Sequence, residues 1–361
     1  MNPKLLLAAF SAIFILVSCS PKESKLPTFD FSRTNFKTIE LSDDLIVKRW
    51  NRVDLESTDE IFIPPYYKII PCNSCIIAYS FNHIVQFSPE GKFLKIIARE
   101  GNGPEEVNSI NDCIYDPAEE KLYWAESFNG GAITCYNLKT DTFDTPIINY
   151  SKSGLSAIRK NGENSLICFP YVFGESTQPV YTQDLDGNLI DQKRSQTINS
   201  TGAAVGIELN VFSLNDNWYY QGNFEDTLFN ALTYEPTAIF SKGKELNLDN
   251  AINRLDNSLR SLKSPFTTDK HLFLRYVEYK LIPDEGALMM YPARTGHYLL
   301  DNNLKNALII KSFLFSPLGK KYEGEELDQF FSKLSSHNPK YVVYIVENEE
   351  DNATLYIGEL F

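Results

Sequence analysis

The sequence predicts an all-β protein that folds as a six-bladed β-propeller with two short helical insertions. Aromatic residues make up 13% of the 361 positions, with 24 Phe and 20 Tyr but only 3 Met. Aromatic side chains favour strands. Short apolar runs alternate with turn signals along the chain, and these turns recur at a nearly constant spacing, which is typical of a repeated structural unit.

The turn signals define the predicted blades. They are rich in Gly, Pro, Asn and Asp, which supply the backbone dihedral angles that tight turns need. They begin at residues 88, 138, 184, 234 and 301. The first three intervals are about 48 residues on average, within the range of one four-stranded blade. The fourth interval is longer, which indicates inserted residues.

Two helical insertions are predicted from apolar residues at helical spacing. The first covers residues 246–263 and places Leu248, Ile252, Leu255, Leu259 and Leu262 on one face. Asn247 or Asp249 can cap its start. The second runs from about Glu325 to Ser336, after a break at Gly324, with Leu327, Phe330, Phe331 and Leu334 on one face. The alternative, a separate α/β domain, needs more helices than these two.

The sixth blade is predicted to contain both ends of the chain. Its C-terminal strands are Tyr341–Ile345 and Thr354–Ile357, and an N-terminal strand near Phe36–Leu41 would complete it. This arrangement closes the ring and leaves no long exposed sheet edge. Six blades over residues 36–361 average about 54 residues each, whereas seven would leave no room for the helices. Seven blades therefore rank second.

The N-terminus is predicted to be a signal peptide over residues 1–18. Leu5–Val17 are mostly apolar, and as a helix they would span about 20 Å, less than the roughly 30 Å hydrocarbon core of a membrane. Leu16-Val17-Ser18-Cys19 resembles the lipobox of bacterial lipoproteins. That resemblance implies that Cys19 is the acylated first residue of the mature chain, anchored in the cell envelope. An ordinary secretory signal with a chance cysteine is the alternative.

Residues 19–35 are predicted to form a flexible tether between the lipid and the fold. They contain Pro, Ser and several charges without periodicity. The alternative is an extended segment that packs against the domain through Phe29 and Phe31. The predicted domains are therefore the signal peptide, this tether and one propeller over residues 36–361.

Composition and motifs exclude several classes of protein. The chain has 34 basic and 47 acidic residues, a net charge of -13, so it lacks the basic surface of a nucleic-acid-binding protein and repels anionic lipid. It contains no P-loop, no G-x-S-x-G and no H-E-x-x-H sequence. No catalytic residue, metal site or cofactor is predicted.

The cysteines beyond residue 19 do not form a disulfide framework. Because their number is odd, at least one of the five stays unpaired: Cys72, Cys75, Cys113, Cys135 and Cys168. The single C-x-x-C at residues 72–75 has no second pair or paired histidines at the spacing of a zinc site. Inert buried thiols, or one local disulfide, are the predicted states.

One stretch, Phe87–Glu106, suggests a family. It resembles the first blade of six-bladed β-propeller lipoproteins from Bacteroidota, which are relatives of NHL-repeat propellers. Gly101, Gly103, Pro104 and Glu106 match the pattern, whereas Ala98, Glu105 and Val107 depart from it. Asn223–Phe229 and Asn338-Pro339 are similar to later segments of that family. The resemblance implies the fold and a location at the outer membrane, and it does not imply an activity.

Candidate binding residues come from two places. Arg99, Glu100 and Asn102 can project from the glycine-rich loop, although the loop can also serve only as a tight connection between blades. Arg275 lies in the predicted strand Leu272–Tyr279 and can point into the central channel, or it can be a solvated residue of a packed strand. An arginine in an otherwise acidic channel mouth can hold a carboxylate or sulfate group.

Three functions remain open from the sequence. The preferred one is a lipid-anchored module that binds a glycan, a peptide or an envelope protein at one mouth of the channel. The second is a calcium-dependent enzyme of the lactonase or esterase type, which needs several carboxylates around one ion. The third is a structural subunit of an envelope complex that docks through its helices. The fold alone does not choose among them.

Overall fold

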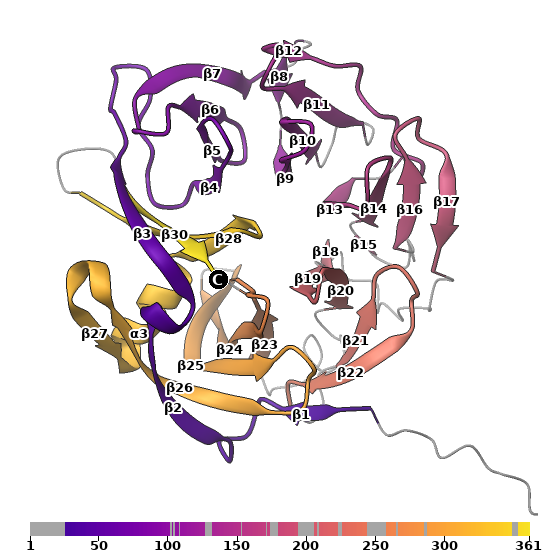
Figure 1. Ribbon diagram of the computed structural model, residues 1–361. Helices are drawn as coiled ribbons and strands as arrows, with labels where there is room; N and C mark the ends of the chain where they lie inside the picture. The colour runs from indigo at the N-terminus through magenta and orange to yellow at the C-terminus, as the bar shows by residue number, and fades with distance from the viewer. Residues whose placement is uncertain are drawn as a thin grey trace, which may run out of the picture.

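The protein is a ring of six β-sheets around a central channel, as Figure 1 shows in a view along that channel. The computed structural model describes residues 26–361 except 102, 104, 108, 127–131, 153, 171, 174–179, 194–205, 208, 223–225, 244–257, 265, 285–286 and 349–352. The all-β class and the six-bladed propeller are both confirmed. Cys19 and Asn102, which the sequence singled out, lie outside the described residues.

The first three blades follow one another along the chain. Blade 1 contains β4 (Lys68–Pro71), β5 (Ile76–Tyr79), β6 (Ile84–Phe87) and β7 (Phe93–Glu100), with β8 (Glu106–Val107) beside β7. Blade 2 contains β9 (Ile110–Asp116), β10 (Lys121–Glu126), β11 (Ile133–Asn137) and β12 (Thr142–Phe143). Blade 3 contains β13 (Leu155–Lys160), β14 (Ser165–Pro170), β16 (Tyr181–Asp184) and β17 (Leu189–Gln192). A separate pair is formed by β15 (Val172–Phe173) and β18 (Gly206–Ile207).

The last three blades each include a strand from the N-terminal segment. Blade 4 contains β19 (Leu209–Leu214), β20 (Asn217–Gly222), β21 (Thr227–Asn230), β22 (Pro236–Ser241) and β1 (Thr28–Asp30). Blade 5 contains β23 (Ser258–Lys263), β24 (His271–Asp284), β25 (Ala287–Asp301), β26 (Ala307–Phe315) and β2 (Lys37–Ser42), and β27 (Lys320–Glu323) pairs with β26. Blade 6 contains β28 (Leu334–Asn338), β29 (Tyr341–Val346), β30 (Thr354–Leu360) and β3 (Val47–Asp54). Short 3-10 turns occupy Asp43–Leu45 and Ser316–Leu318.

The predicted turn spacing has a simple structural basis. Each of the five turn signals joins the third and fourth strands of one blade, from blade 1 to blade 5. In the first turn, Gly91 has a φ of 89°, and a Cβ there would lie 2.3 Å from the backbone oxygen of Asp54. In the third turn, the Asp184 carboxylate accepts hydrogen bonds from the backbone N–H groups of Asp186 and Asn188. Blade 6 has no such turn because its fourth strand, β3, comes from the other end of the chain.

The N-terminal segment binds three consecutive blades to one another. β1 and β2 add as parallel strands to β22 and β26, and β3 adds as an antiparallel strand to β30. The prediction of a flexible tether through residue 35 is therefore wrong for residues 28–31: Phe31 is fully buried and its ring contacts those of Phe240 and Tyr298. The strand near Phe36–Leu41 exists as β2, but it joins blade 5, and β3 takes the place predicted for it in blade 6.

Hydrophobic cores lie between neighbouring blades. The described residues form six clusters, one for each of the six blade interfaces around the ring. Strand side chains alternate between the two faces, so Val342 and Tyr344 face blade 5 while Val343 and Ile345 face blade 1. Both faces of an inner strand are buried, which explains why these strands read as continuous apolar runs.

Only one of the two predicted helices is present in the described residues. α3 (Gly324–Ser332) buries Leu327, Phe330 and Phe331, as expected, but ends earlier than predicted, because Leu334–Asn338 form the innermost strand of blade 6. The helix predicted over residues 246–263 is wrong at its C-terminal end, where β23 pairs with β24 across six positions. Residues 246–257 lie outside the described part of the chain.

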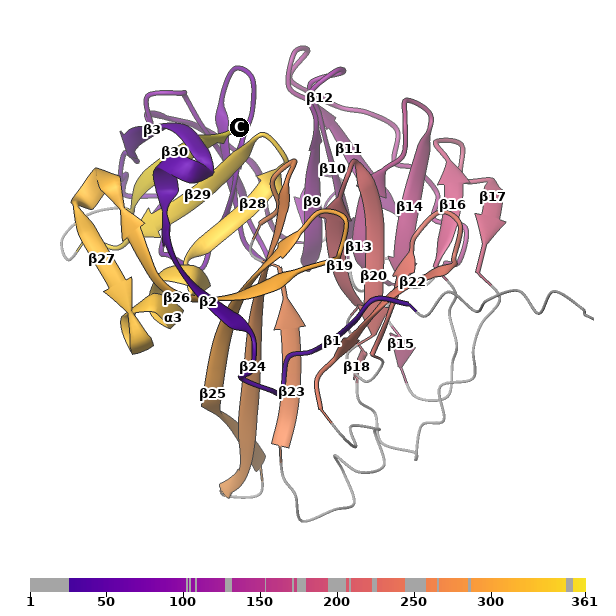
Figure 2. The ribbon, with the colours of Figure 1, turned by 60° about the horizontal axis from the view of Figure 1, so that its bottom comes forward.

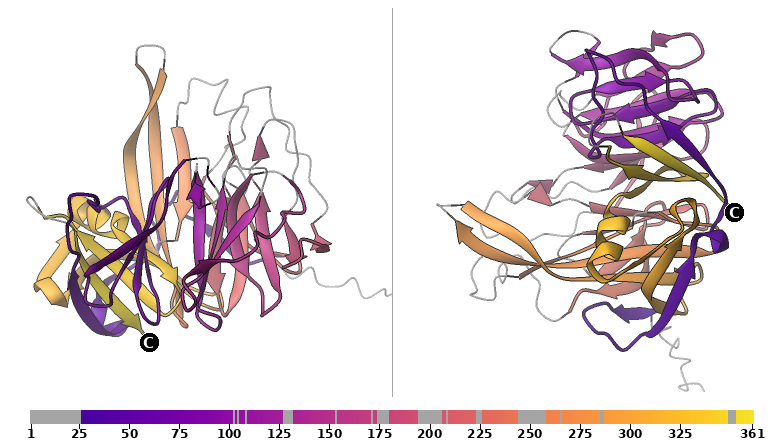
Figure 3. Two further views of the ribbon diagram at one scale, coloured as in Figure 1. Left: turned by 90° about the horizontal axis from the view of Figure 1, so that it is seen from above. Right: turned by 90° about the vertical axis from the view of Figure 1, so that its left-hand side faces the viewer.

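The long interval between the fourth and fifth turns contains an extended hairpin. β24 and β25 pair along 14 positions, more than any other pair of strands in the described residues. Figures 2 and 3 show this hairpin rising well beyond one face of the ring. β24 begins at His271 and its far end is Asp284, so the hairpin tip and the turn before His271 lie at opposite faces.

Candidate functional site

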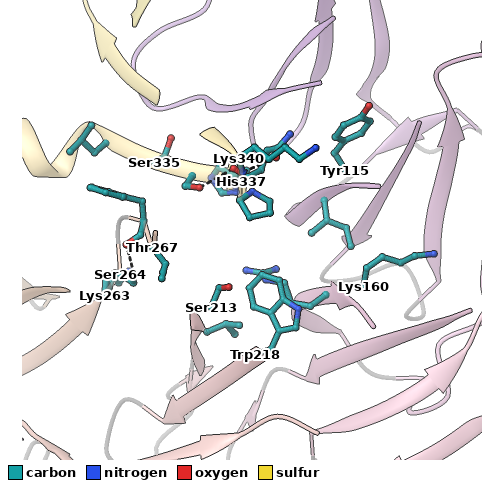
Figure 4. A pocket seen from close by; sticks show the side chains of 18 of the residues that line it. Tyr115, Lys160, Ser213, Trp218, Lys263, Ser264, Thr267, Ser335, His337 and Lys340 are labelled. Atoms are coloured by element: carbon teal, nitrogen blue, oxygen red, sulfur yellow. Dashed lines mark hydrogen bonds between the residues drawn. The ribbon is translucent and has the colours of Figure 1, made fainter. Parts of the chain in front are cut away.

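A cavity of about 510 Å³ lies where the inner strands of five blades converge. Its wall is built from the C-terminal parts of β9, β13, β19 and β23, from β28, and from the turns that follow these strands. The cavity therefore lies on the face opposite the tip of the β24–β25 hairpin. Figure 4 shows its polar side chains converging from several blades, with Ser213 and Trp218 facing His337 and Lys340 across the cavity.

The charges on the cavity wall are all positive among its described residues. Five basic residues line it and no Asp or Glu does: Arg159, Lys160, Lys263, Arg275 and Lys340. The sequence had suggested an acidic channel mouth, from a net charge of -13. The structure corrects that expectation, because carboxylates that belong to this region lie behind the wall rather than on it.

Arg159 is held in place by two partners. Its guanidinium donates to the buried Asp112 carboxylate, which also accepts the Ile158 backbone N–H at 3.0 Å. Burial alone would raise the pKa of Asp112, but the Arg159 and Lys68 charges and the Ile158 N–H together outweigh it and hold the pKa below its usual value. The same guanidinium lies 5.0 Å from the ring centroid of Trp218. Trp218 is thereby fixed as a half-buried ring at the cavity wall.

Arg275 reaches the cavity from blade 5 and is anchored by α3. Its guanidinium donates two hydrogen bonds to Asp328, at 2.8 and 2.9 Å. Nε2 of the buried His297 lies 3.3 Å from the same carboxylate, and its ring stacks on Phe331. Burial would raise the pKa of Asp328, but His297 and Arg275 hold it well below its usual range. The carboxylate is therefore ionised and compensates the Arg275 charge.

Lys160 is also paired, whereas Lys340 is not. Nζ of Lys160 lies 3.1 Å from the Asp116 carboxylate. Lys340 is exposed in the turn between β28 and β29, and no carboxylate of the described residues lies within ion-pair distance of its Nζ. Lys340 therefore contributes a positive charge that the described part of the protein does not neutralise.

His337 adds a neutral polar group to the wall. Its Nδ1 lies 3.4 Å from the buried Tyr79 hydroxyl. Burial and the nearby Lys68 charge lower the pKa of His337 to about 3. At neutral pH the ring is therefore uncharged, and one ring nitrogen is a donor while the other is an acceptor.

The rest of the wall combines hydroxyl groups with apolar surface. The hydroxyl residues are Ser213, Ser264, Thr267, Ser332, Ser335 and Ser336. Ile114, Val211, Phe266 and Leu334 contribute apolar atoms to the cavity wall. A concave, largely apolar site with a few converging polar groups is the usual form of a small-molecule binding site.

The structure separates the residues that the sequence grouped as candidates. Arg275, for which the sequence left a channel-facing and a solvated position open, lines the channel cavity. Arg99 and Glu100 are exposed on β7, at the outside of blade 1, and Glu100 accepts a hydrogen bond from the Asn82 amide at 2.8 Å. Arg99 lines a second cavity of about 450 Å³, formed by β7 and the Gly103–Glu106 segment. Arg99 and Arg275 therefore belong to different surfaces.

Sequence reasoning missed Arg159, Trp218, His337 and Lys340. Arg159 and Lys160 end an apolar strand just before Asn161-Gly162, and Pro339-Lys340 follows another strand end. Asn161-Gly162 and Pro339-Lys340 are turn signals that mark where the innermost strands of blades 3 and 6 end. The ends of these strands could therefore be predicted once the order of the blades was assigned. The convergence of the side chains could not be predicted, because these residues are far apart in the chain.

The described cysteines are free thiols, and Cys75, Cys113, Cys135 and Cys168 are buried. Burial raises the pKa of the Cys113 thiol, so that thiol stays protonated at neutral pH. Cys72 and Cys75 lie on either side of a two-residue turn, and the Cys72 N–H donates to the Cys75 carbonyl.

Within the described residues, no group of three or more His, Cys, Asp or Glu side chains is placed to hold a metal ion.

Comparisons with known proteins agree with the fold. A crystal structure from Bacteroides fragilis NCTC 9343, assigned as an exported protein, has 14% identity and a TM-score of 0.60, and the match covers 93% of this chain and 99% of that one. U3-55K has 10% identity and a TM-score of 0.49, over 85% of this chain and 98% of that one. At 14% identity, the likeness to the exported protein shows the fold alone.

No curated protein matches the sequence. Within its described residues, the protein has no helix that is both long enough and apolar enough to cross a membrane. The sequence matches the family described as "Domain of unknown function (DUF4934)" over residues 26–357, almost the whole chain. This protein is therefore a member of that family.

Proposed function

We propose that this protein is a lipid-anchored binding module of the bacterial cell envelope, at the outer membrane, and that it holds its ligand in the channel cavity. The observation that carries the proposal is the cavity of about 510 Å³, in which side chains from five blades converge. Its volume lies within the roughly 300–1,000 Å³ of typical ligand sites. The exported relative from Bacteroides fragilis is consistent with a location outside the cytoplasm.

The wall of the cavity is suited to binding because its side chains are held in place. Arg159 and Arg275 are each fixed by a carboxylate, and Trp218 is fixed by Arg159. Preorganised side chains reduce the entropy lost when a ligand binds. No cluster of described residues offers the carboxylates of the calcium-dependent enzyme considered from the sequence.

Filling the cavity tests its role. A Ser213→Trp substitution places an indole into the cavity beside Trp218, since residues 213 and 218 are paired across β19 and β20. We expect this variant to lose at least tenfold of its affinity for any ligand found by screening wild-type protein on glycan and peptide arrays. Thr142→Trp, on the exposed outer strand of blade 2, is the control. Equal affinity of the two variants, or no ligand on any array, would refute the proposal.

The anchor is tested separately. A Cys19→Ala substitution removes the thiol that the lipobox offers for acylation. We expect the variant protein to leave the membrane fraction or to accumulate as uncleaved precursor, because no acyl chains remain to hold it. Membrane fractionation and the mass of the N-terminal peptide report the result. A variant that fractionates and is processed like wild type would contradict lipidation at Cys19.

A further inference from the structure

The channel cavity has a charge opposite to that of the protein around it. The chain carries a net charge of -13, yet among the described residues every Asp, Glu, Lys or Arg on the cavity wall is basic. Clefts lined by one sign of charge focus the electric field and concentrate ions of the opposite sign. An anionic ligand is therefore attracted to the cavity, although the protein surface as a whole repels it.

The positive charge available to a ligand comes from specific positions. Carboxylates behind the wall compensate Arg159, Lys160 and Arg275, three of the basic residues that line the cavity. Lys340 has no carboxylate partner among the described residues. Lys340 is therefore the group best placed to form a new charge-assisted hydrogen bond with an anion.

The other groups on the wall match the surface of a sugar. A pyranose ring has an apolar C–H face and several hydroxyl groups that both donate and accept hydrogen bonds. Trp218 offers an aromatic surface, and six Ser and Thr hydroxyls line the same cavity. The neutral His337, whose Nδ1 faces the Tyr79 hydroxyl, has one further ring nitrogen that can donate or accept a hydrogen bond at the cavity wall opposite Trp218. Aromatic, hydroxyl and cationic groups thus occur together in one enclosed site.

We infer that the channel cavity binds an acidic saccharide, a sugar chain that carries a carboxylate or a sulfate group. This inference rests on the proposed function and specifies its ligand class. The sugar ring packs on Trp218, the Ser and Thr side chains exchange hydrogen bonds with its hydroxyls, and Lys340 contacts its anionic group. A neutral sugar of the same shape makes the first two kinds of contact and lacks the third.

The ligand test compares an acidic sugar with its neutral counterpart. Isothermal titration of the wild-type mature protein with trigalacturonate and its full methyl ester isolates the effect of the carboxylates, and a chondroitin sulfate disaccharide, which carries a carboxylate and a sulfate, adds a sulfated ligand. We expect trigalacturonate or the sulfated disaccharide to bind at least tenfold more tightly than the neutral ester, and added salt to weaken that binding. Equal or tighter binding of the ester, or no binding of either acidic sugar at millimolar concentration, would overturn the inference.

Variants then assign the contacts. Lys340→Gln is expected to weaken binding of the acidic sugar about tenfold. Lys92→Gln, which changes an exposed lysine in the turn between β6 and β7 of blade 1, should leave the affinity unchanged. Trp218→Ala should weaken acidic and neutral sugars alike, because it removes the stacking surface. Equal affinities of the two lysine variants would overturn the inference. If neither acidic sugar binds but Ser213→Trp abolishes the binding of a neutral ligand, the proposed function stands and only the assignment of an acidic ligand fails.

Discussion

Removal of residues 341–361 unfolds the whole propeller rather than one blade. The deletion takes away β29 and β30, whose alternating side chains belong to the cores on both sides of blade 6. It also leaves β3 without its partner strand. The remaining chain would be an open ring with two unpaired edges and two exposed apolar faces. We expect loss of cooperative thermal unfolding, measured by circular dichroism and calorimetry.

The control for this truncation is a chain that begins at residue 26 and keeps the C-terminus. It retains β1, β2 and β3, so we expect it to melt with the cooperativity of the mature protein. A C-terminal truncation that melts in the same single transition would mean that blade 6 does not close the ring. The Asn338 amide, which donates to the Pro71 carbonyl at 2.7 Å, links blade 6 to blade 1 and adds to this closure.

An Asp328→Asn substitution is expected to lower the free energy of unfolding by about 3 kcal/mol, because Arg275 and His297 lose the charge that both contact. The side chains of Asp328 and Arg275 are each about one-fifth exposed. The expected loss therefore lies at the lower end of the range for breaking a buried ion pair. Urea denaturation measures the change. The matched control is Glu326→Gln on the same helix, since the exposed pair of Glu326 with Lys320 should contribute little.

The effect of the Asp328 substitution should depend on pH in a defined direction. The pKa of Asp328 is lower in the folded protein than in the unfolded chain, so its ionised form stabilises the fold. This contribution is fully present above about pH 4, the unfolded value, and is lost as the pH falls toward the folded value. The difference between wild type and Asp328→Asn should therefore be largest at neutral pH. A difference that grows as the pH falls below 4 would contradict the ion-pair explanation.

Much of the fold was predictable because it is encoded locally. The turn signals correctly marked the third hairpin of blades 1 to 5, since Gly, Asn, Asp and Pro have specific backbone requirements at tight turns. Strand partners were harder, because pairing is a tertiary property. The apolar alternation of Lys37–Ser42 predicts a strand, but nothing in the segment says that it pairs with β26 rather than with β30.

The C-terminal part of the helix predicted over residues 246–263 shows the same limit at residues 258–263. Leu259 and Leu262 fit a helical spacing, and so short a segment contains too few residues to distinguish the two periodicities. Its neighbours decide the outcome, because β24 offers a partner at every position from Ser258 to Lys263. Tertiary pairing therefore overrides the local preference at this position.

The candidate site was predictable only in part. The strand alternation left Arg275 either facing the channel or solvated on a packed strand, and in the structure Arg275 lines the cavity, whereas its role in binding stays a prediction. Its partner Asp328 is 53 residues away on a helix, and no spacing rule connects them. Arg159 and Trp218 likewise come from blades 3 and 4, and only the packing of these neighbouring blades brings them together. The site is a property of the assembled propeller, which explains why no single segment identifies it.

The central claim is that the channel cavity is the ligand site of this protein and that it binds acidic sugars. The most direct test is a crystal structure of the mature chain with the acidic saccharide that binds most tightly in titration. We expect the sugar ring to lie against Trp218, with its anionic group within hydrogen-bond distance of Lys340. A saccharide ordered elsewhere on the propeller while the cavity stays empty, or one whose anionic group points away from Lys340, would contradict it.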